Sequence, residues 1–259
     1  MKRKITILTI AFLSSVLMCA NVFAAVTGSY GRIKWTLDDS GNLTLSGSGE
    51  MWNYGYNNSP FKGYEIRKAT VEYGITSIGE SAFQGCSGMT KLTLPNSLER
   101  IGGNAFQDCT GLTELTLPSS VWDILDSAFY GCSGLTKLTL PNSLVSIGSG
   151  AFQGCSGLTE LTLPNSITSI GVGVFQGCSG MTELTLPNSV TSIGGYAFAY
   201  CSGLSKITSL AEIPPVCGYG VFDGVNKTNC ELIVPKGSVA AYKQAYGWNG
   251  FSNIRGFSE

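Results

Sequence analysis

The chain has 259 residues, a formal net charge of −1, no histidine and only 13% charged side chains. It lacks the basic stripe typical of nucleic-acid binding, and without histidine no Ser-His or Cys-His catalytic pair can form. Its 43% apolar residues and 34 glycines indicate instead an extensive core and many tight corners.

The first 24 residues have the features of a secretory signal. A basic start over 2–4 precedes a mostly apolar run over 5–17, and small residues suit cleavage before Ala25. The apolar run is too short for a membrane span. Cys19 offers a lipid anchor as the alternative, but Met18 stands where a small residue is needed. We predict a signal peptide over 1–24 and a secreted or cell-surface protein with no transmembrane segment after signal removal.

Residues 25–63 lie outside the repeat that follows, and they predict an N-terminal capping hairpin. Residues 35–37 and 43–47 have the pattern of strands, with turn chemistry at 39–41. An aromatic cluster follows over 51–64. We expect this segment to shield the first coil, because repeat arrays need protected ends.

A 23-residue repeat over 64–209 predicts a solenoid. Cysteine recurs at this spacing six times, at Cys86, Cys109, Cys132, Cys155, Cys178 and Cys201. Such a unit buries its apolar face only by stacking on its neighbours. Leu92 and Leu94 alternate with polar residues, which predicts a strand that Pro95 ends. We expect about eight coils, with a parallel concave sheet and short extended or 3₁₀ segments on the other side.

Stacking at a strand spacing of roughly 4.8 Å turns each inward position into a column. One column is predicted to consist of Phe83, Phe106, Phe129, Phe152, Phe175 and Phe198. Each buried ring contributes several kcal/mol, at about 25 cal/mol per Å², before entropy is subtracted. The architecture depends on Phe106 contacting both Phe83 and Phe129.

Residues 210–259 predict an irregular last coil and a C-terminal cap. The strand over 232–234 arrives late relative to the repeat. Residues 238–247 predict a helix with Ser238 as N-cap and with Val239, Tyr242 and Ala245 on one face.

The cysteine column predicts free buried thiols. Parallel side chains keep their Cβ atoms about as far apart as their Cα atoms, beyond the ~3.8 Å of a disulfide. We therefore expect each thiol to donate to a carbonyl of the next coil. A linear column supplies no tetrahedral metal site, and we predict no metal or cofactor. Cys217 and Cys230 lie outside the register, and the sequence leaves open a single disulfide between them.

The outward strand positions predict a polar face. It contains Thr93, Thr116, Thr139, Thr162 and Thr185 beside a column of lysines and glutamates. Opposite charges on neighbouring strands favour in-register stacking, which is the interpretation we prefer. The alternative is a hydroxyl surface for a polar ligand. No aromatic residue interrupts this face, which argues against a sugar-stacking groove or a protein hot spot there.

Departures from the repeat are better guides to recognition. Glu99 and Arg100, and in the next coil Trp122 and Asp123, replace small residues in the segment after the proline turn. Trp122 stands at an outward position, where an exposed ring beside acids could anchor a partner. These four are candidate partner-binding residues; the alternative is that the ring packs along the edge of its own coil. A scatter of tyrosines without a usable pattern comprises Tyr130, Tyr196 and Tyr200.

Several motifs recur in each coil: Ser77-Ile78-Gly79, Ala82-Phe83, Cys86 and Leu92-Thr93-Leu94-Pro95, with their equivalents. With them the chain resembles, over 28–259, the BspA-like leucine-rich-repeat family of bacterial surface proteins. The resemblance implies a right-handed leucine-rich-repeat superhelix that binds host or microbial surface proteins, and it supplies no catalytic residues. We expect an exported, non-enzymatic protein-interaction or adhesion module. A passive cell-envelope scaffold without a specific ligand is the alternative.

Overall fold

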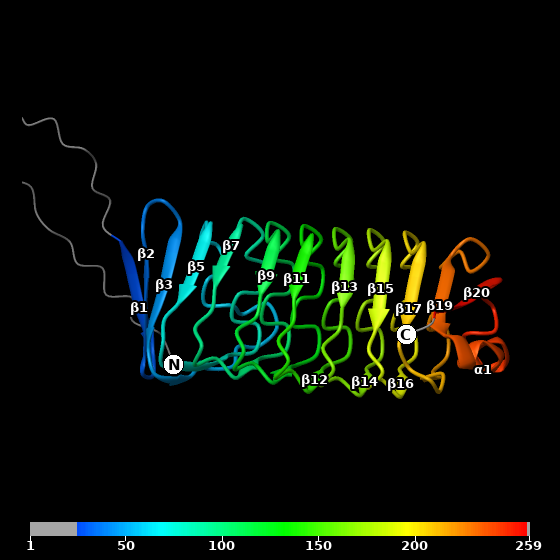
Figure 1. Cartoon of the computed structure of the whole chain (residues 1–259). Coiled ribbons are helices and arrows are strands. Elements are labelled where there is room, and N and C mark those ends of the chain that lie inside the picture. The colour runs from blue at the N-terminus through cyan, green and yellow to red at the C-terminus, as the bar shows by residue number, and fades with distance from the viewer. Residues whose placement is uncertain (1–24, 258–259) are drawn as a thin grey trace, which may run out of the picture.

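The computed structural model describes residues 25–257, so the predicted signal peptide lies outside the described residues. These residues form a solenoid of about nine turns, which confirms the predicted repeat architecture. Each turn has a front strand, a short back strand, and a return segment of tight turns. Figure 1 shows the front strands side by side in a row along the molecule.

The front strands pair in parallel at the spacing of the repeat. Leu115 lies opposite Leu138, and Leu161 lies opposite Leu184. The front strands after the N-terminal hairpin are β5 (Lys68–Val71), β7 (Lys91–Thr93), β9 (Glu114–Thr116), β11 (Lys137–Thr139), β13 (Glu160–Thr162), β15 (Glu183–Leu186), β17 (Lys206–Ser209), β19 (Glu231–Pro235) and β20 (Asn253–Phe257).

The front sheet consists of three separately hydrogen-bonded sections. In the described chain, β7 is not paired with β9, and β11 is not paired with β13. Leu92 and Leu138, each on the N-terminal side of a break, are only half-buried, whereas Leu161 is buried. The following coil leaves Leu92 and Leu138 partly uncovered at these two places.

The back strands form a second set of parallel ladders. They are β4 (Gly49–Glu50), β6 (Ile75–Ile78), β8 (Arg100–Ile101), β10 (Asp123–Ile124), β12 (Ser146–Ile147), β14 (Ser169–Ile170), β16 (Ser192–Ile193) and β18 (Val216–Cys217). The segment predicted as extended or 3₁₀ is therefore extended. Its isoleucines point into the core; Ile101 and Ile124 are fully buried.

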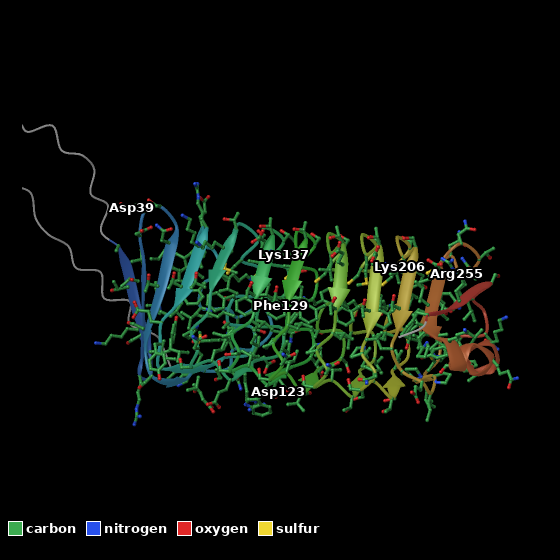
Figure 2. All side chains as sticks on the ribbon, in the orientation of Figure 1. Asp39, Asp123, Phe129, Lys137, Lys206 and Arg255 are labelled. Carbon is green, nitrogen blue, oxygen red and sulfur yellow. The ribbon has the colours of Figure 1, made fainter. Side chains whose placement is uncertain are left out.

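The phenylalanine column is continuous. The Phe106 ring centroid lies 5.0 Å from that of Phe83 and 5.2 Å from that of Phe129, so the contact on which the architecture depends is confirmed. Stacking continues across both breaks in the front sheet, with 5.2 Å between Phe106 and Phe129 and 5.6 Å between Phe152 and Phe175. Figure 2 shows Phe129 inside the solenoid. The return segments therefore hold the coils together where the front strands do not.

The N-terminal hairpin is part of the solenoid as well as its cover. Strands β2 (Ile33–Leu37) and β3 (Asn42–Gly47) are antiparallel, and an additional strand, β1 (Val26–Tyr30), lies outside them. β3 also pairs in parallel with β5, so it is already the front strand of a turn. The structure has about nine turns where we expected about eight, with β3 added before β5 and β20 added after β19.

The C-terminal cap closes the other end with a short helix. A 3₁₀ turn, η1 (Lys236–Ser238), leads into α1 (Val239–Gln244). The helix ends three residues earlier than predicted because Ala245 is extended, and Ser238 makes no side-chain capping bond. The predicted inward residue Tyr242 is buried, and its hydroxyl donates to the carbonyl oxygen of Ala211 at 2.9 Å.

Candidate binding surface

The exposed threonines lie on the front sheet as predicted. Four of the five are exposed and Thr185 is half-buried. Figure 2 shows Lys137 and Lys206 on the same face. Shallow hollows of about 370 Å³ lie beside each break; Thr90 and Thr113 line one, and Thr136 and Thr159 line the other. The face offers hydroxyl groups and separate charges without a deep pocket.

Charge neutralisation between coils is less complete than expected. Of the column that runs from Lys91 to Lys206, one pair of side chains forms an ion pair in the described chain, Lys206 Nζ to Glu183 Oε2 at 3.0 Å. Glu160 lies directly opposite Glu183, which places two like charges together. In-register stacking therefore rests mainly on the core and the backbone ladders.

Trp122 is exposed on the back of the solenoid and is held by an arginine. Its side chain is 42% exposed. The guanidinium carbon of Arg100, one coil earlier, lies 5.6 Å from the ring centroid, within the range of a cation–π contact. Arg100 Nε also donates to Asp123 Oδ2 at 3.1 Å. The structure thus brings together three of the four candidate partner-binding residues.

Asp123 has a different position from the one we expected. We expect Asp123 to contact a partner beside the tryptophan, but it is buried, with 7% of its surface exposed. It occupies β10 directly opposite Arg100 in β8, so its carboxylate fixes the arginine. A partner could reach Trp122, Arg100 and the exposed Glu99, whereas Asp123 acts from beneath them.

Two exposed apolar residues lie near Trp122 in the coil register. Val145, at the equivalent position of the next coil, is 60% exposed, and Leu125 is 37% exposed. Leu125 stands where other coils have glycine, as at Gly102 and Gly148. The cation–π contact of the Trp122 ring is with Arg100, a side chain of the preceding coil.

The column cysteines are free and buried, as predicted. The hydrogen-bond direction differs, because each donor reaches the preceding coil: Cys132 Sγ donates to the Phe106 carbonyl at 3.2 Å. Burial raises the pKa of the Cys132 thiol from 9.0 to about 12. Nucleophilic and metal-binding chemistry needs the thiolate, so these thiols serve as packing groups.

Cys217 and Cys230 are also free, so the disulfide considered between them is not formed. The two residues lie on different sides of the solenoid. Cys217 is in the back strand β18, whereas Cys230 immediately precedes the front strand β19.

Tyrosines that had no usable pattern in the sequence form a group at the C-terminal end of the repeat array. Tyr196 and Tyr219 come from successive coils, and their ring centroids lie 5.5 Å apart. The available signal was in the repeat itself, because Tyr196 and Tyr200 stand at the positions of Gly173 and Gly177. One coil thus has tyrosine at two positions where the preceding coil has glycine, which departs from the repeat sequence as clearly as Trp122 does.

Two further properties concern residues 25–257 alone. No helix in this range has the length and apolar character needed to cross a membrane. No group of three or more Cys, Asp or Glu side chains in the same range is arranged to hold a metal ion.

Comparison with known proteins identifies the repeat. The family model of the BspA type leucine rich repeat region matches in six copies, over residues 56–178 and 122–233. A leucine rich cell surface protein from Faecalibacterium prausnitzii has a similar fold, with a TM-score of 0.60 at 23% identity over 84% of this chain and 72% of that chain. A leucine rich repeat protein from T. pallidum gives 0.54 at 24% identity over 67% and 88%. No curated protein matches the chain. Since the family model spans more than half of the sequence, the chain belongs to the BspA type leucine-rich-repeat family.

Proposed function

We propose that the chain is an exported, non-enzymatic protein-interaction or adhesion module whose main contact residue is Trp122. The observation that carries this proposal is a large ring, 42% exposed, held in place above a buried ion-pair partner. Tryptophan and arginine are the residue types most enriched among binding hot spots. Val145 and Leu125 extend the apolar surface beside the ring.

The fixed geometry of the ring favours affinity. Ordering a mobile side chain at an interface costs about 0.5–1.5 kcal/mol. Arg100 already restricts the Trp122 ring, and Asp123 restricts Arg100, so much of this cost is met before a partner arrives. The same arrangement keeps a cation beside the ring, which suits an acidic or polar rim on the partner.

Surface location and the lack of catalysis have separate support. The predicted signal peptide favours export, and the similar Faecalibacterium prausnitzii protein is itself described as a cell surface protein. The chain contains no histidine, and the thiols of the cysteine column are kept protonated by burial. Repeat proteins use their extended rigid surfaces for binding.

The test is capture of surface proteins by the immobilised mature chain. We expect a specific protein from epithelial or bacterial surface extracts, and we expect Trp122→Ala to weaken its affinity at least about tenfold while the melting temperature stays unchanged. Trp52→Ala is the matched control, because Trp52 is also exposed (57%) but lies near the N-terminal end. Equal losses in both variants, or no captured partner, would instead favour the passive scaffold.

A further inference from the structure

Four exposed tyrosines gather where the last regular coils meet the C-terminal cap. Tyr196, Tyr200, Tyr219 and Tyr246 are 38%, 58%, 69% and 62% exposed. The rings of Tyr196 and Tyr219 meet edge to face at 76°. The pKa of Tyr196 is raised above 10.0, first by partial desolvation and then by the potentials of Tyr219, Asp223, Tyr200 and Tyr246. The four rings and one carboxylate therefore share one region of the surface.

Two of these tyrosines occupy backbone positions that disfavour a bulky side chain. Tyr196 has φ 58° and Tyr200 has φ 59°, in the left-handed region. The two preceding coils place glycine at both positions, as at Gly173 with φ 62° and Gly177 with φ 73°. A non-glycine residue there costs roughly 1–2 kcal/mol. Small polar residues have the same conformation in earlier coils, at Ser81, Asn104, Asp108 and Ser127, so Tyr196 and Tyr200 are distinguished by their large rings.

A small cavity with polar walls lies beside the rings. Its volume is about 140 Å³, and its lining includes Asp223, Lys227, Tyr246 and Asn249. Within residues 25–257, no ion pair joins Asp223 to Lys227. Gly218, Gly220 and Gly250 complete much of the wall, so the backbone is open to close approach.

The cavity is also close to the rings in the coil register. The Tyr200 amide donates to the Asp223 carbonyl at 2.6 Å, and the Tyr196 amide donates to the Tyr219 carbonyl at 2.9 Å. The counterparts of Tyr196 and Tyr200 on the next coil are Gly220 and Gly224, which have the same left-handed backbone conformation. Tyr219 and Asp223 immediately precede these glycines, and Gly220 also lines the cavity. Aromatic faces and cavity walls come from two adjacent coils and the cap.

We propose that this region, the tyrosine site, binds a saccharide. A sugar ring has an apolar C–H face that packs on an aromatic ring, and hydroxyl groups that need both donors and acceptors. The tyrosine rings supply the apolar surface, Asp223 accepts, Lys227 donates, and Asn249 does both. The cavity is smaller than the roughly 300–1,000 Å³ of drug-sized pockets, which fits one terminal sugar of a longer chain.

The charges of the site favour a neutral polyhydroxyl ligand over an ion. An aromatic cage for a cation would not place an ammonium group in its own wall, and Lys227 lies there. An anion would face the unpaired Asp223 carboxylate. The tyrosine site is separate from the Trp122 surface and does not depend on its role.

The test uses the mature chain on a printed array of defined oligosaccharides, followed by calorimetry with the best-bound compound. We expect Tyr196→Gly with Tyr200→Gly to weaken binding at least tenfold. The melting temperature should stay equal or rise, because glycine adopts this backbone conformation without strain. Asp223→Ala should weaken binding separately. Tyr130→Gln is the matched control, since it also restores the repeat residue found at Gln107 and Gln153, and it should bind normally.

Two results would overturn the proposal. One is that the original chain binds no oligosaccharide on the array more strongly than the double glycine variant does. The other is equal affinity in the double variant and the original chain. Loss of a captured protein in the double variant, without any oligosaccharide binding, would identify the tyrosine site as a protein interface instead. Neither result affects the Trp122 experiment, whose readout is a protein partner and whose variant leaves the tyrosines intact.

Discussion

At the residue scale, the cysteine column shows how one side chain serves as both core group and hydrogen-bond donor. Each thiol is small enough to fill the corner of a coil, and Sγ lies 3.2–3.4 Å from a phenylalanine carbonyl of the preceding coil for Cys109 through Cys201. The carbonyl would otherwise be buried with one fewer partner. In these five coils the cysteine therefore fills the core and also donates a hydrogen bond that ties its coil to the preceding one.

The buried thiols predict loss of stability at alkaline pH. Burial raises the folded-state pKa of Cys132 from 9.0 to about 12, so folding favours the protonated form. The stabilisation is complete below pH 9 and is lost as pH rises from 9 towards 12, where only the unfolded chain releases the proton. Each such thiol lowers the free energy of unfolding by about 1.4 kcal/mol per pH unit in that window. Urea unfolding between pH 8 and pH 10.5 measures this slope.

Cys132→Ala is the control for the alkaline prediction. Removing one thiol should reduce the slope by about one proton, although the stability at pH 8 will also fall because a small cavity is created. An unchanged slope in Cys132→Ala would show that tyrosines or lysines, and not the thiols, control the alkaline transition.

At the element scale, α1 covers the last coil through one buried tyrosine. The Tyr242 hydroxyl lies 2.7 Å from Ser209 Oγ and donates to the Ala211 carbonyl. Ser209 itself is fully buried, so no water replaces the tyrosine hydroxyl. Buried hydrogen bonds therefore attach the C-terminal cap to the last coil. Ring contacts add to them, such as that between Tyr242 and Trp248, whose centroids lie 5.2 Å apart.

Tyr242→Phe should loosen the C-terminal cap. The ring contacts remain, but the Ser209 hydroxyl and the Ala211 carbonyl lose a partner in a buried place, which costs about 1–3 kcal/mol. Denaturant unfolding measures the loss. Tyr246→Phe makes the same chemical change four residues later, at a tyrosine that is 62% exposed, and it should stay within about 0.5 kcal/mol of the original chain. Equal stability of the two variants would contradict the role of the network.

The same scale shows what the sequence could predict. The phenylalanine and cysteine columns follow from strict periodicity, since equal residues at a fixed period must meet in a stack. The burial of Asp123 does not follow, because it depends on Arg100 lying opposite in the neighbouring coil. The early helix end at Ala245 and the breaks in the front sheet also depend on local packing. The tyrosine site combines parts from different coils and the cap, so no single stretch of sequence contains it.

At the scale of the whole molecule, each coil contacts its neighbours through the same columns, so stability is approximately a sum over coils and interfaces. The ends differ from this pattern: β1 and the hairpin cover one end, and α1 with β20 covers the other. One coil in the middle of the array can therefore replace another, whereas the caps have no equivalent elsewhere in the described chain.

Deletion of residues 133–155 should leave a folded, shorter solenoid. The cut removes one complete period and joins Cys132 to Ser156, which restores the repeat text. We expect the circular dichroism per residue to be unchanged and the melting temperature to fall by several degrees, because one interface is lost. Deleting 133–144 alone is the control: it shifts the register by half a period and should prevent folding. If both deletion variants were soluble and unfolded cooperatively, the dependence of folding on in-register contacts between neighbouring coils would be contradicted.

The buried thiols also require that folding be fast compared with thiol oxidation. A chain that crosses a membrane unfolded, by the proposed export route, would carry the eight thiols of residues 25–257 into an oxidising compartment while nothing yet covers them. In the unfolded chain the thiol pKa is not raised by burial, so thiolates can form and take part in thiol–disulfide exchange that gives non-native disulfides. Burial in the folded solenoid prevents this reaction. If coils fold rapidly, through local contacts between adjacent units, the thiols are buried before they are oxidised. Slow folding would instead give chains with non-native disulfides within and between molecules.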